Sequence, residues 1–333
     1  MGLALLALPL SASAQFPGTN GKLVYLNQAG DLMSANPDGT GVVTIVTAGT
    51  LNATTPPVVN KLGTKMAYAN ATGLALINVD GTGFTQLTST AGDEFPQFSP
   101  DGAKLYFDNG GDILSIGTDG TSRTTVLAQA GNLTYVGPTV SPDGLTLGVI
   151  GSDSGTNISD VYTVAATGGS ATNVTNNASG TNTFAADYSP DGTQFLLLTE
   201  DATDGRIATM AVAGGAQTTL ATLALSSNTV YTSATWSPDG AKVVAVRSST
   251  SGGSGLFSQG TILTMLADGT GAADISSLGA NNSPVFWSVL GLTVAAPALP
   301  NTATPLVQLP WLWVGLGLLA IAGIELGRRL RRI

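Results

Sequence analysis

Short apolar runs alternate with tight polar turns along most of the chain. A typical run, Lys242-Val243-Val244-Ala245-Val246, is rich in β-branched residues and predicts a strand. The runs follow a Ser-Pro-Asp-Gly tetrapeptide or a relative of it. In a tight turn, proline presets φ at the second position, aspartate hydrogen-bonds its own backbone, and glycine accepts a positive φ. The pattern therefore predicts a series of antiparallel hairpins.

The tetrapeptide recurs with a nearly constant period. Its four serines are 42, 48 and 48 residues apart, a spacing typical of the four-stranded blades of a β-propeller. Because each aspartate is fixed between proline and glycine at the same place in the repeat, we assign the sixteen residues to turn formation. They are Ser99, Pro100, Asp101, Gly102, Ser141, Pro142, Asp143, Gly144, Ser189, Pro190, Asp191, Gly192, Ser237, Pro238, Asp239 and Gly240.

A second turn signal has the same period. Asp-Gly or Gly-Gly pairs favour the primed two-residue turns that join adjacent antiparallel strands. They occur at Asp38-Gly39, Asp80-Gly81, Asp119-Gly120, Gly168-Gly169, Gly214-Gly215 and Asp268-Gly269. Each unit is therefore expected to read strand, first turn, strand, loop, strand, second turn, strand.

The ends of the repeat region complement each other. The first unit, from Gly21, lacks the strand that precedes the first turn in later units, whereas residues 283–288 supply such a strand with no turn after it. We therefore predict an all-β fold: a six-bladed propeller of four-stranded blades over residues 15–288, in which 283–288 complete blade one. This closure removes free sheet edges. Seven blades is the alternative.

The repeat is similar to that of the TolB-like propeller family. The likeness rests on Ser-Pro-Asp-Gly with its aliphatic strand, on residues 112–121, and on the beginning Phe16-Pro17-Gly18-Thr19-Asn20, and it covers roughly residues 16–288. The second unit departs from it, since Asn60-Lys61-Leu62-Gly63 replaces the tetrapeptide. The resemblance implies a contact surface at the mouth of the central channel. The candidate residues there are Asp93, Glu94, Asp187, Tyr231 and Asn282.

The amino-acid composition excludes several classes of function. The net charge is −9, and four of the twelve basic residues lie in the last six positions, so the rest of the chain repels nucleic acid. The chain contains neither histidine nor cysteine. This excludes Ser-His-Asp triads, thiol catalysis, disulfides and His- or Cys-ligated metals. Calcium loops of the Asp-x-Asp-x-Asp-Gly type are absent, and we predict no metal and no cofactor.

The first fourteen residues predict a secretory signal peptide. An apolar run ends in the small-residue pattern Ala12-Ser13-Ala14, which makes Gln15 the expected mature start. The alternative is a buried apolar strand.

The C-terminal part predicts a membrane anchor. Residues 289–305 form a linker rich in Pro, Ala and Thr, 306–325 are long enough and apolar enough to cross a bilayer as a helix, and 326–333 form a basic tail. The arginines of the tail place it on the cytoplasmic side and the propeller outside the cell.

The linker also contains Leu299, Pro300, Asn301, Thr302 and Ala303. This pentapeptide, the apolar span and the arginines together resemble an LPxTG-type cell-wall sorting signal. The resemblance implies that a sortase cleaves after Thr302 and joins the protein to the cell wall. The alternative is an ordinary single-pass anchor.

These features together predict a non-enzymatic protein, exported and anchored at the bacterial cell surface, that binds a protein or a glycan. No catalytic residue set stands out. One alternative is a glycan lyase or hydrolase that uses paired carboxylates on a propeller scaffold. Another is a periplasmic TolB-like protein of envelope integrity.

Overall fold

The computed structural model describes residues 16–27, 29, 31–47, 57–225, 229–249, 258–280 and 286–289. The predicted signal peptide, the linker beyond residue 289, the anchor, the sorting pentapeptide and Asn282 lie outside these residues. Within the described part of the chain, no helix has the length and apolar character needed to span a membrane.

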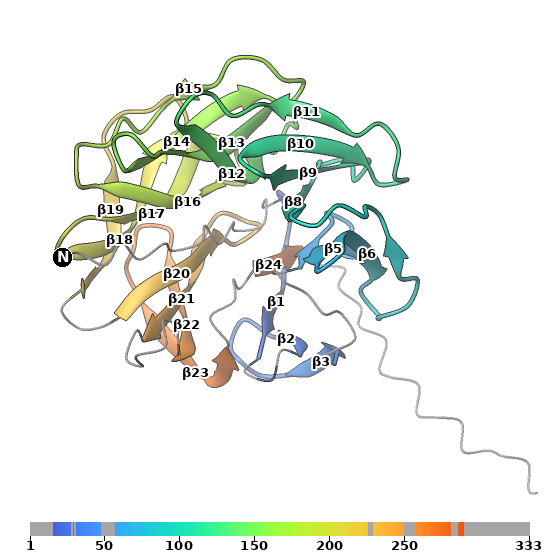
Figure 1. Cartoon of the computed structure of the whole chain (residues 1–333). Helices are drawn as coiled ribbons and strands as arrows, with labels where there is room; N and C mark the ends of the chain where they lie inside the picture. The colour runs from blue at the N-terminus through green and yellow to red at the C-terminus, as the bar shows by residue number, and fades with distance from the viewer. Residues whose placement is uncertain are drawn as a thin grey trace, which may run out of the picture. The chain divides into compact units, whose positions relative to one another are not determined.

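The described strands form six antiparallel sheets of four strands each, arranged radially around a central axis (Figure 1). The six-bladed propeller predicted from the repeat is confirmed. In each blade the strands follow one another from the axis outward, and only blade one takes its innermost strand from the C-terminal side of the chain.

From the axis outward, the strands of blades one to three are β24 (Phe286–Val289), β1 (Asn20–Leu26), β2 (Leu32–Ala35), β3 (Val43–Val46); β4 (Val58–Val59), β5 (Lys65–Asn70), β6 (Gly73–Asn78), β7 (Thr85–Gln86); β8 (Glu94–Phe98), β9 (Lys104–Asn109), β10 (Asp112–Gly117) and β11 (Thr124–Leu127). Those of blades four to six are β12 (Leu133–Val140), β13 (Thr146–Asp153), β14 (Ile158–Ala165), β15 (Thr172–Asn173); β16 (Asn182–Tyr188), β17 (Gln194–Glu200), β18 (Asp204–Ala211), β19 (Thr218–Ala224); β20 (Thr229–Trp236), β21 (Lys242–Ser249), β22 (Ser258–Leu266) and β23 (Ala273–Ala280).

Blade one is closed by the strand from the far end of the repeat region, as predicted. In the β24–β1 pair, Trp287 lies opposite Leu23 and Phe286 opposite Val24. The Ser288 hydroxyl accepts a hydrogen bond from the Lys22 main-chain N–H at 2.9 Å. Trp287 is 4% exposed and packs among side chains of blades six and one. The ring is therefore held by residues more than 260 positions apart.

The core lies between neighbouring blades. The two middle strands of each blade alternate apolar side chains toward both neighbouring sheets, so the largest buried residues, such as Phe107 and Phe195, sit at blade interfaces. Tyr188 packs against Phe195 with ring centroids 4.5 Å apart. Stability thus comes from side chains shared by adjacent blades.

Adjacent blades also interlock through main chain. In blades one, three and five, the outer strand bulges at Ile45, Val126 and Leu220. The carbonyl group of each bulged residue lies against the glycine of the second turn in the next blade, at Gly81, Gly168 and Gly269 respectively. The contact is tightest at Gly269, where an added Cβ would lie 2.5 Å from the Leu220 carbonyl oxygen. The second-turn glycines therefore serve the blade-to-blade contact as well as the turn.

Candidate binding face

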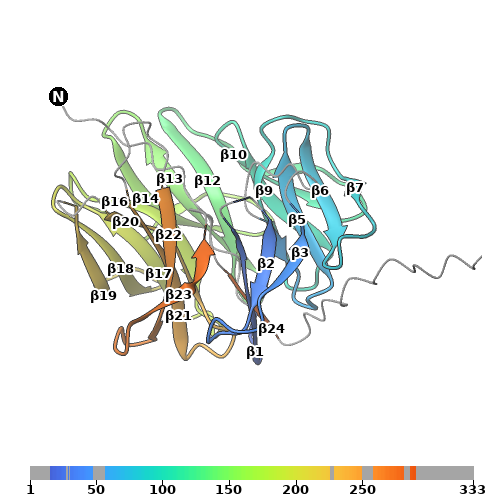
Figure 2. The same cartoon turned by 90° about the horizontal axis from the view of Figure 1, so that it is seen from below.

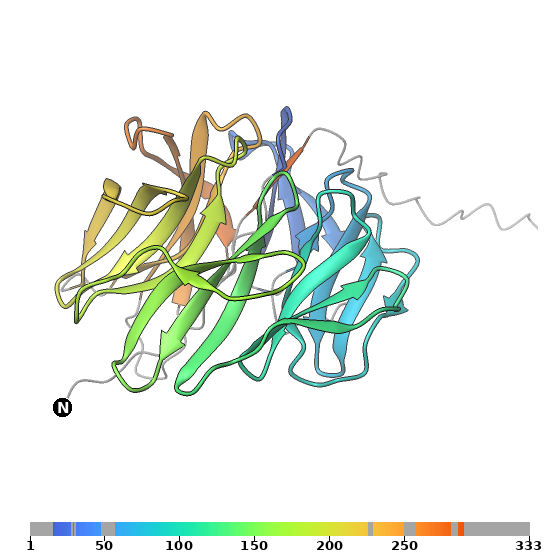
Figure 3. The same cartoon turned by 90° about the horizontal axis from the view of Figure 1, so that it is seen from above.

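The strand order gives the propeller two unlike faces. The first turns of blades two to six and the second turns of all six blades lie at one end of the strands, which we call the turn face. The loops between the two middle strands, and the connections between blades, lie at the other end, which we call the loop face. Figure 2 and Figure 3 view the propeller across its axis and show connections at both ends of the strands.

The turn face is built from copies of one turn. In the copy at Ser99, the Gly102 N–H donates to the Ser99 carbonyl at 2.8 Å, and the Ser99 hydroxyl donates to Asp101 Oδ1 at 2.6 Å. That hydroxyl bond lowers the pKa of Asp101 below its ordinary value. The copies at Ser141, Ser189 and Ser237 make the same bonds. In each copy, one carboxylate oxygen of the aspartate is therefore bonded within its own turn.

The divergent second unit forms the same turn with different atoms. The Asn60 side-chain oxygen accepts the Thr64 and Lys65 main-chain N–H groups at 2.9 and 3.0 Å, and the Gly63 N–H donates to the Asn60 carbonyl at 2.9 Å. An asparagine with a glycine three positions later thus replaces Ser-Pro-Asp-Gly without loss of the turn.

A short N-terminal arm, residues 16–19, adds to the turn face. Phe16 is 6% exposed and packs with side chains of blades two to four, whereas the Gly18 N–H donates to the Pro238 carbonyl of blade six at 3.1 Å. Asn20, just beyond the arm, donates to Asp239 at 2.9 Å. The arm therefore ties opposite sides of the ring together at this face.

Side chains from three of the innermost strands meet and bond to one another. Asp187 on β16 is fully buried and accepts hydrogen bonds from Thr235 on β20 at 2.8 Å and from Thr139 on β12 at 3.4 Å. Burial raises the pKa of Asp187 to about 8, which keeps the carboxyl group protonated at neutral pH. The structure thus places this predicted mouth residue inside the ring, where it joins three blades.

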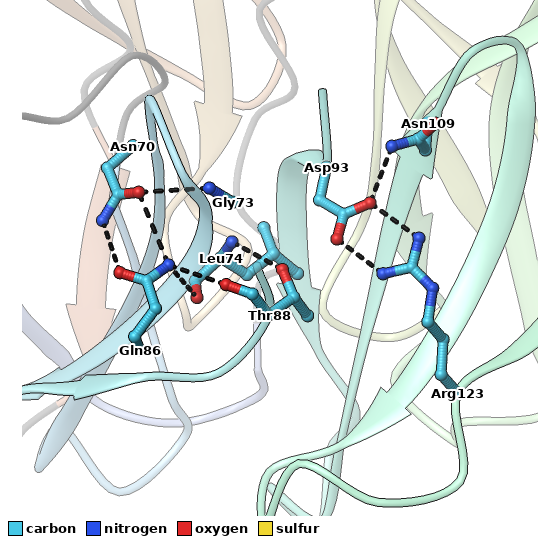
Figure 4. A network of polar contacts seen from close by, with 8 residues as sticks. All are labelled: Asn70, Gly73, Leu74, Gln86, Thr88, Asp93, Asn109 and Arg123. Atoms are coloured by element: carbon cyan, nitrogen blue, oxygen red, sulfur yellow. Dashed lines mark hydrogen bonds and ion pairs between the residues drawn. The ribbon is translucent and has the colours of Figure 1, made fainter. Parts of the chain in front are cut away.

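Asp93 is also buried and is held in an ion pair. Its two carboxylate oxygens accept hydrogen bonds from the Arg123 guanidinium at 2.5 and 2.7 Å, and Asn109 donates to it at 2.8 Å (Figure 4). Arg123 in turn lies over the Phe107 ring, 4.9 Å from its centroid. The bidentate geometry satisfies the carboxylate within the protein.

Glu94 differs from Asp93 because it retains exposed surface at the loop-face end of β8. It lies directly opposite Asp108 of β9, so both side chains are on the same side of the blade. Asp108 is 5% exposed and accepts the Gly137 N–H at 2.8 Å. Burial, followed by the nearby charges of Glu94 and Asp93, raises the pKa of Asp108 to about 7.

Tyr231 occupies the corresponding end of β20 in blade six. It is half-buried and lies opposite Arg247 of β21, which pairs with Asp274 at 2.9 Å. Of the five predicted mouth residues, the structure therefore puts Glu94 and Tyr231 at the loop-face ends of innermost strands. Asp93 and Asp187, in contrast, are fully buried.

Asp108 is the site residue that sequence reasoning missed. Its signal was present, because an aspartate follows the apolar run Leu105-Tyr106-Phe107 inside a strand. Counting the hairpin outward from the Ser99 turn in regular register would have placed it opposite Phe95, because the bulge between Glu94 and Gln97 that brings Glu94 opposite Asp108 is not visible in the sequence.

The two faces differ in where the lysines lie. All five lysines of the chain lie toward the turn face, in a first turn or near the turn-face end of a second strand, at Lys22, Lys61, Lys65, Lys104 and Lys242, together with the turn aspartates. The loop face has acidic residues at its strand ends and hairpins, including Glu94, Asp112, Asp153, Glu200, Asp201 and Asp204. Arg206 there is already paired with Asp201 and Asp204 at 2.6 and 3.2 Å. Within the described residues, no group of three or more acidic side chains is arranged to hold a metal ion.

Comparisons with known proteins support the fold. No protein-family model and no curated protein matches the sequence. Among solved structures, the chain is similar to TolB from Acinetobacter baumannii, with a TM-score of 0.61 and 20% identity over 84% of this chain and 68% of that one. It is also similar to a chain of the nidogen/laminin complex, with a TM-score of 0.61 and 11% identity over 80% and 98% of the two chains. An oligogalacturonate lyase in complex with manganese matches with a TM-score of 0.51 and 16% identity over 79% and 74%. The chain has a TolB-like propeller fold, one that serves proteins of different activities.

Proposed function

We propose that this protein is a non-enzymatic binding module that contacts a protein or a glycan through its loop face. The observation that carries the proposal is the difference between the two faces. Five first turns share the same main-chain hydrogen bonds, between Asn60, Ser99, Ser141, Ser189 or Ser237 and the residue five positions later. Among the described residues, the loops between the middle strands instead vary from two residues after Asn70 to four after Asp153. Recognition generally resides in variable loops on a rigid scaffold.

The state of three buried carboxylates also supports binding over catalysis. Asp93 is neutralised by Arg123, and Asp187 is enclosed between two threonines. Asp160 accepts hydrogen bonds from Asn173, Thr175 and the Asn177 main chain. Groups held in this way stabilise the scaffold and are not available to a substrate.

One pair of carboxyl groups favours the enzymatic alternative. Asp108 and Glu94 are cross-strand neighbours, and a carboxyl group with its pKa raised to about 7 beside a second carboxylate is the arrangement of a general acid and its partner. A glycan hydrolase or lyase could use them. Turnover of oligosaccharides by the full chain that is lost in Asp108→Asn would replace the binding proposal with this one.

The binding proposal predicts that neutralising the loop face weakens binding. The double variant Glu94→Gln/Asp153→Asn should reduce binding of the full chain to isolated cell-wall fragments or surface-protein extract about tenfold, as loss of two interface charges does. Asp119→Asn/Asp143→Asn is the matched control, because it removes two charges from the turn face while asparagine still supports the turns. Equal loss in both variants, or in neither, would contradict a loop-face site.

We further propose that the protein is exported and anchored by its C-terminal segment as a sortase substrate. The support is the order of the sorting pentapeptide, the apolar span and the arginine cluster in the sequence. Mass spectrometry of protein released from cell walls should find a mature C-terminus at Thr302. A C-terminus beyond Thr302 would reject the sortase step and leave the simple membrane anchor. A soluble periplasmic form would support the TolB-like envelope role instead.

A further inference from the structure

The exposed large hydrophobic side chains of the propeller share one face. In the described part of the chain, all six of them lie at turns or strand ends of the turn face. They are Val42, Val43, Leu62, Phe84, Leu145 and Leu266. A single exposed apolar side chain is ordinary on a soluble protein, but several at one end of the molecule indicate a contact surface.

Four of the six belong to blades one and two. Val42 and Val43 are at the start of the outer strand of blade one. In blade two, Leu62 belongs to the first turn and Phe84 follows the second turn. Leu62 is 73% exposed and Phe84 56%. We call these four residues the apolar patch.

The turns that carry the apolar patch lie next to one another. In blade two, the Val79 N–H donates to the Thr64 carbonyl at 3.1 Å, which joins the second turn to the first. Between the blades, a Cβ added to Gly81 would lie 3.7 Å from the Val46 side chain of blade one. The side chains of the patch therefore gather over one part of the turn face.

Charge separates this part of the turn face from the rest. Blades one and two carry three lysines, Lys22, Lys61 and Lys65, against two turn aspartates, Asp38 and Asp80, because neither blade has a Ser-Pro-Asp-Gly turn. No lysine takes part in the salt bridges of the described residues. In or next to their turns, blades three to six carry two lysines against six aspartates: Lys104, Lys242, Asp101, Asp119, Asp143, Asp191, Asp239 and Asp268.

The chain also leaves the propeller at this place. The last residue of β24, Val289, lies opposite Asn20 at the turn-face end of β1 in blade one. Residues 290–305 lead from there to the apolar span predicted at 306–325, and a chain of that length reaches at most about 55 Å. A span inserted in the membrane would therefore tether the propeller by its turn face, beside the apolar patch.

We propose that the turn face of blades one and two lies against the lipid surface of a membrane with anionic headgroups. The apolar patch enters the headgroup region, and the lysines beside it attract the anionic headgroups. The aspartates on the turns of the other four blades are repelled, so the propeller tilts onto blades one and two. This inference rests on the proposed membrane anchor, and it applies while the span is attached, before a sortase would cleave after Thr302.

The proposed contact has a consequence for binding. The loop face is at the opposite end of the strands, so a propeller that rests on its turn face directs the loop face away from the membrane. The variable loops are then presented to partners outside the cell.

Fluorescence quenching in the full chain tests the contact, because the protein has no cysteine of its own. Leu62→Cys, Leu145→Cys and Thr156→Cys each carry a maleimide dye. The chain is reconstituted in vesicles of phosphatidylcholine and phosphatidylglycerol with brominated acyl chains. Leu62 and Leu145 are matched first-turn leucines, 73% and 68% exposed, and Thr156 is exposed on a loop-face hairpin. Bromine quenches only at close range, so the dye at position 62 should lose most of its fluorescence and the other two should keep theirs.

Flotation of the same vesicles reports on the anchor separately. A chain that does not float with the vesicles would reject the anchor and the lipid contact together. A chain that floats without quenching at position 62 would reject the lipid contact alone. Equal quenching at positions 62 and 145 would overturn the assignment to blades one and two, and quenching at 156 would reverse the orientation.

Removal of lysines gives a second readout in the Leu62→Cys background. Lys61→Gln/Lys65→Gln should lower the ratio of quenched to unquenched protein at least about tenfold, the effect of two lysines near an anionic surface. Lys104→Gln/Lys242→Gln is the matched control, because it removes two turn-face lysines from blades three and six, and it should leave the ratio unchanged. Equal loss in both pairs, or in neither, would overturn the contact with anionic headgroups.

Discussion

Stability should fall as the pH rises from about 4 to about 8, opposite to the usual behaviour of carboxylates in folded proteins. Asp187 has its pKa raised to about 8 by burial at the axis, and Asp108 to about 7. In the unfolded chain both titrate near the ordinary value of 3.8. Between these values the folded state holds protons that the unfolded state has released, so each unit of pH costs about 1.4 kcal/mol per group.

Asp187 has the larger effect on the pH dependence of stability, because its pKa is raised further than that of Asp108. Ionisation linked to Asp187 alone should lower the free energy of unfolding by on the order of 5 kcal/mol across the window. The turn aspartates act in the other direction: their hydrogen bonds lower the pKa of groups such as Asp101 and Asp143, so their contribution is lost below about pH 4. The stability maximum should therefore lie in the mildly acidic range.

Chemical denaturation across pH provides the measurement. Asp187→Asn keeps a donor and an acceptor in place of the neutral acid, so it should match the unaltered chain below about pH 4 and exceed it by a growing margin up to pH 8. Asp119→Asn, at an exposed turn aspartate, is the control and should leave the slope above pH 5 unchanged. Stability that rises from pH 5 to 8 would mean that the axial carboxyl is ionised in the folded protein.

Gly269→Ala should be the most damaging single glycine substitution. The residue has a φ of +84°, and an added Cβ would lie 2.5 Å from the Leu220 carbonyl oxygen and 2.9 Å from its Cα. Both atoms belong to the backbone of the neighbouring blade, so the conflict can be relieved only by separating blades five and six. We expect a loss of about 3 to 4 kcal/mol, the sum of a disfavoured φ and an overpacked interface.

Gly102→Ala separates the two contributions to this loss of stability, the disfavoured φ and the overpacked interface between blades. Gly102 has a φ of +72° but no atom within 4 Å of its added Cβ, so it retains the backbone penalty alone, about 1 to 2 kcal/mol. The difference in denaturation midpoint between the two variants measures the blade-to-blade contact. If the two variants lose equal stability, then the glycine is present only for its turn.

Much of the fold could be predicted from the sequence, because it depends on the chemistry of residues that are close in the chain. The Ser-Pro-Asp-Gly turns and the apolar runs are determined by neighbours within a few residues, so their positions and period could be predicted without coordinates. The closing strand was also readable, because Phe286-Trp287-Ser288 repeats the pattern of Thr235-Trp236-Ser237 and lacks a turn after it.

The candidate site depended on contacts that the sequence pattern does not contain. Asp93, just before β8, and Asp187, near the end of β16, both looked like channel-mouth residues in the sequence, yet one is matched by Arg123 within its own blade and the other by threonines of two flanking blades. Asp108 was overlooked because its neighbour Glu94 is fourteen residues away and meets it only in the paired register.

The sequence by itself determined the repeated strand-turn unit and the partner of the first blade, because each depends on residues close in the chain or on copies of one pattern. The tertiary structure alone decided that the blades number six and not seven, which carboxylates are enclosed and which face is variable. Burial and pairing depend on what the neighbouring blade brings to the same point in space, and residues far apart in the chain supply it.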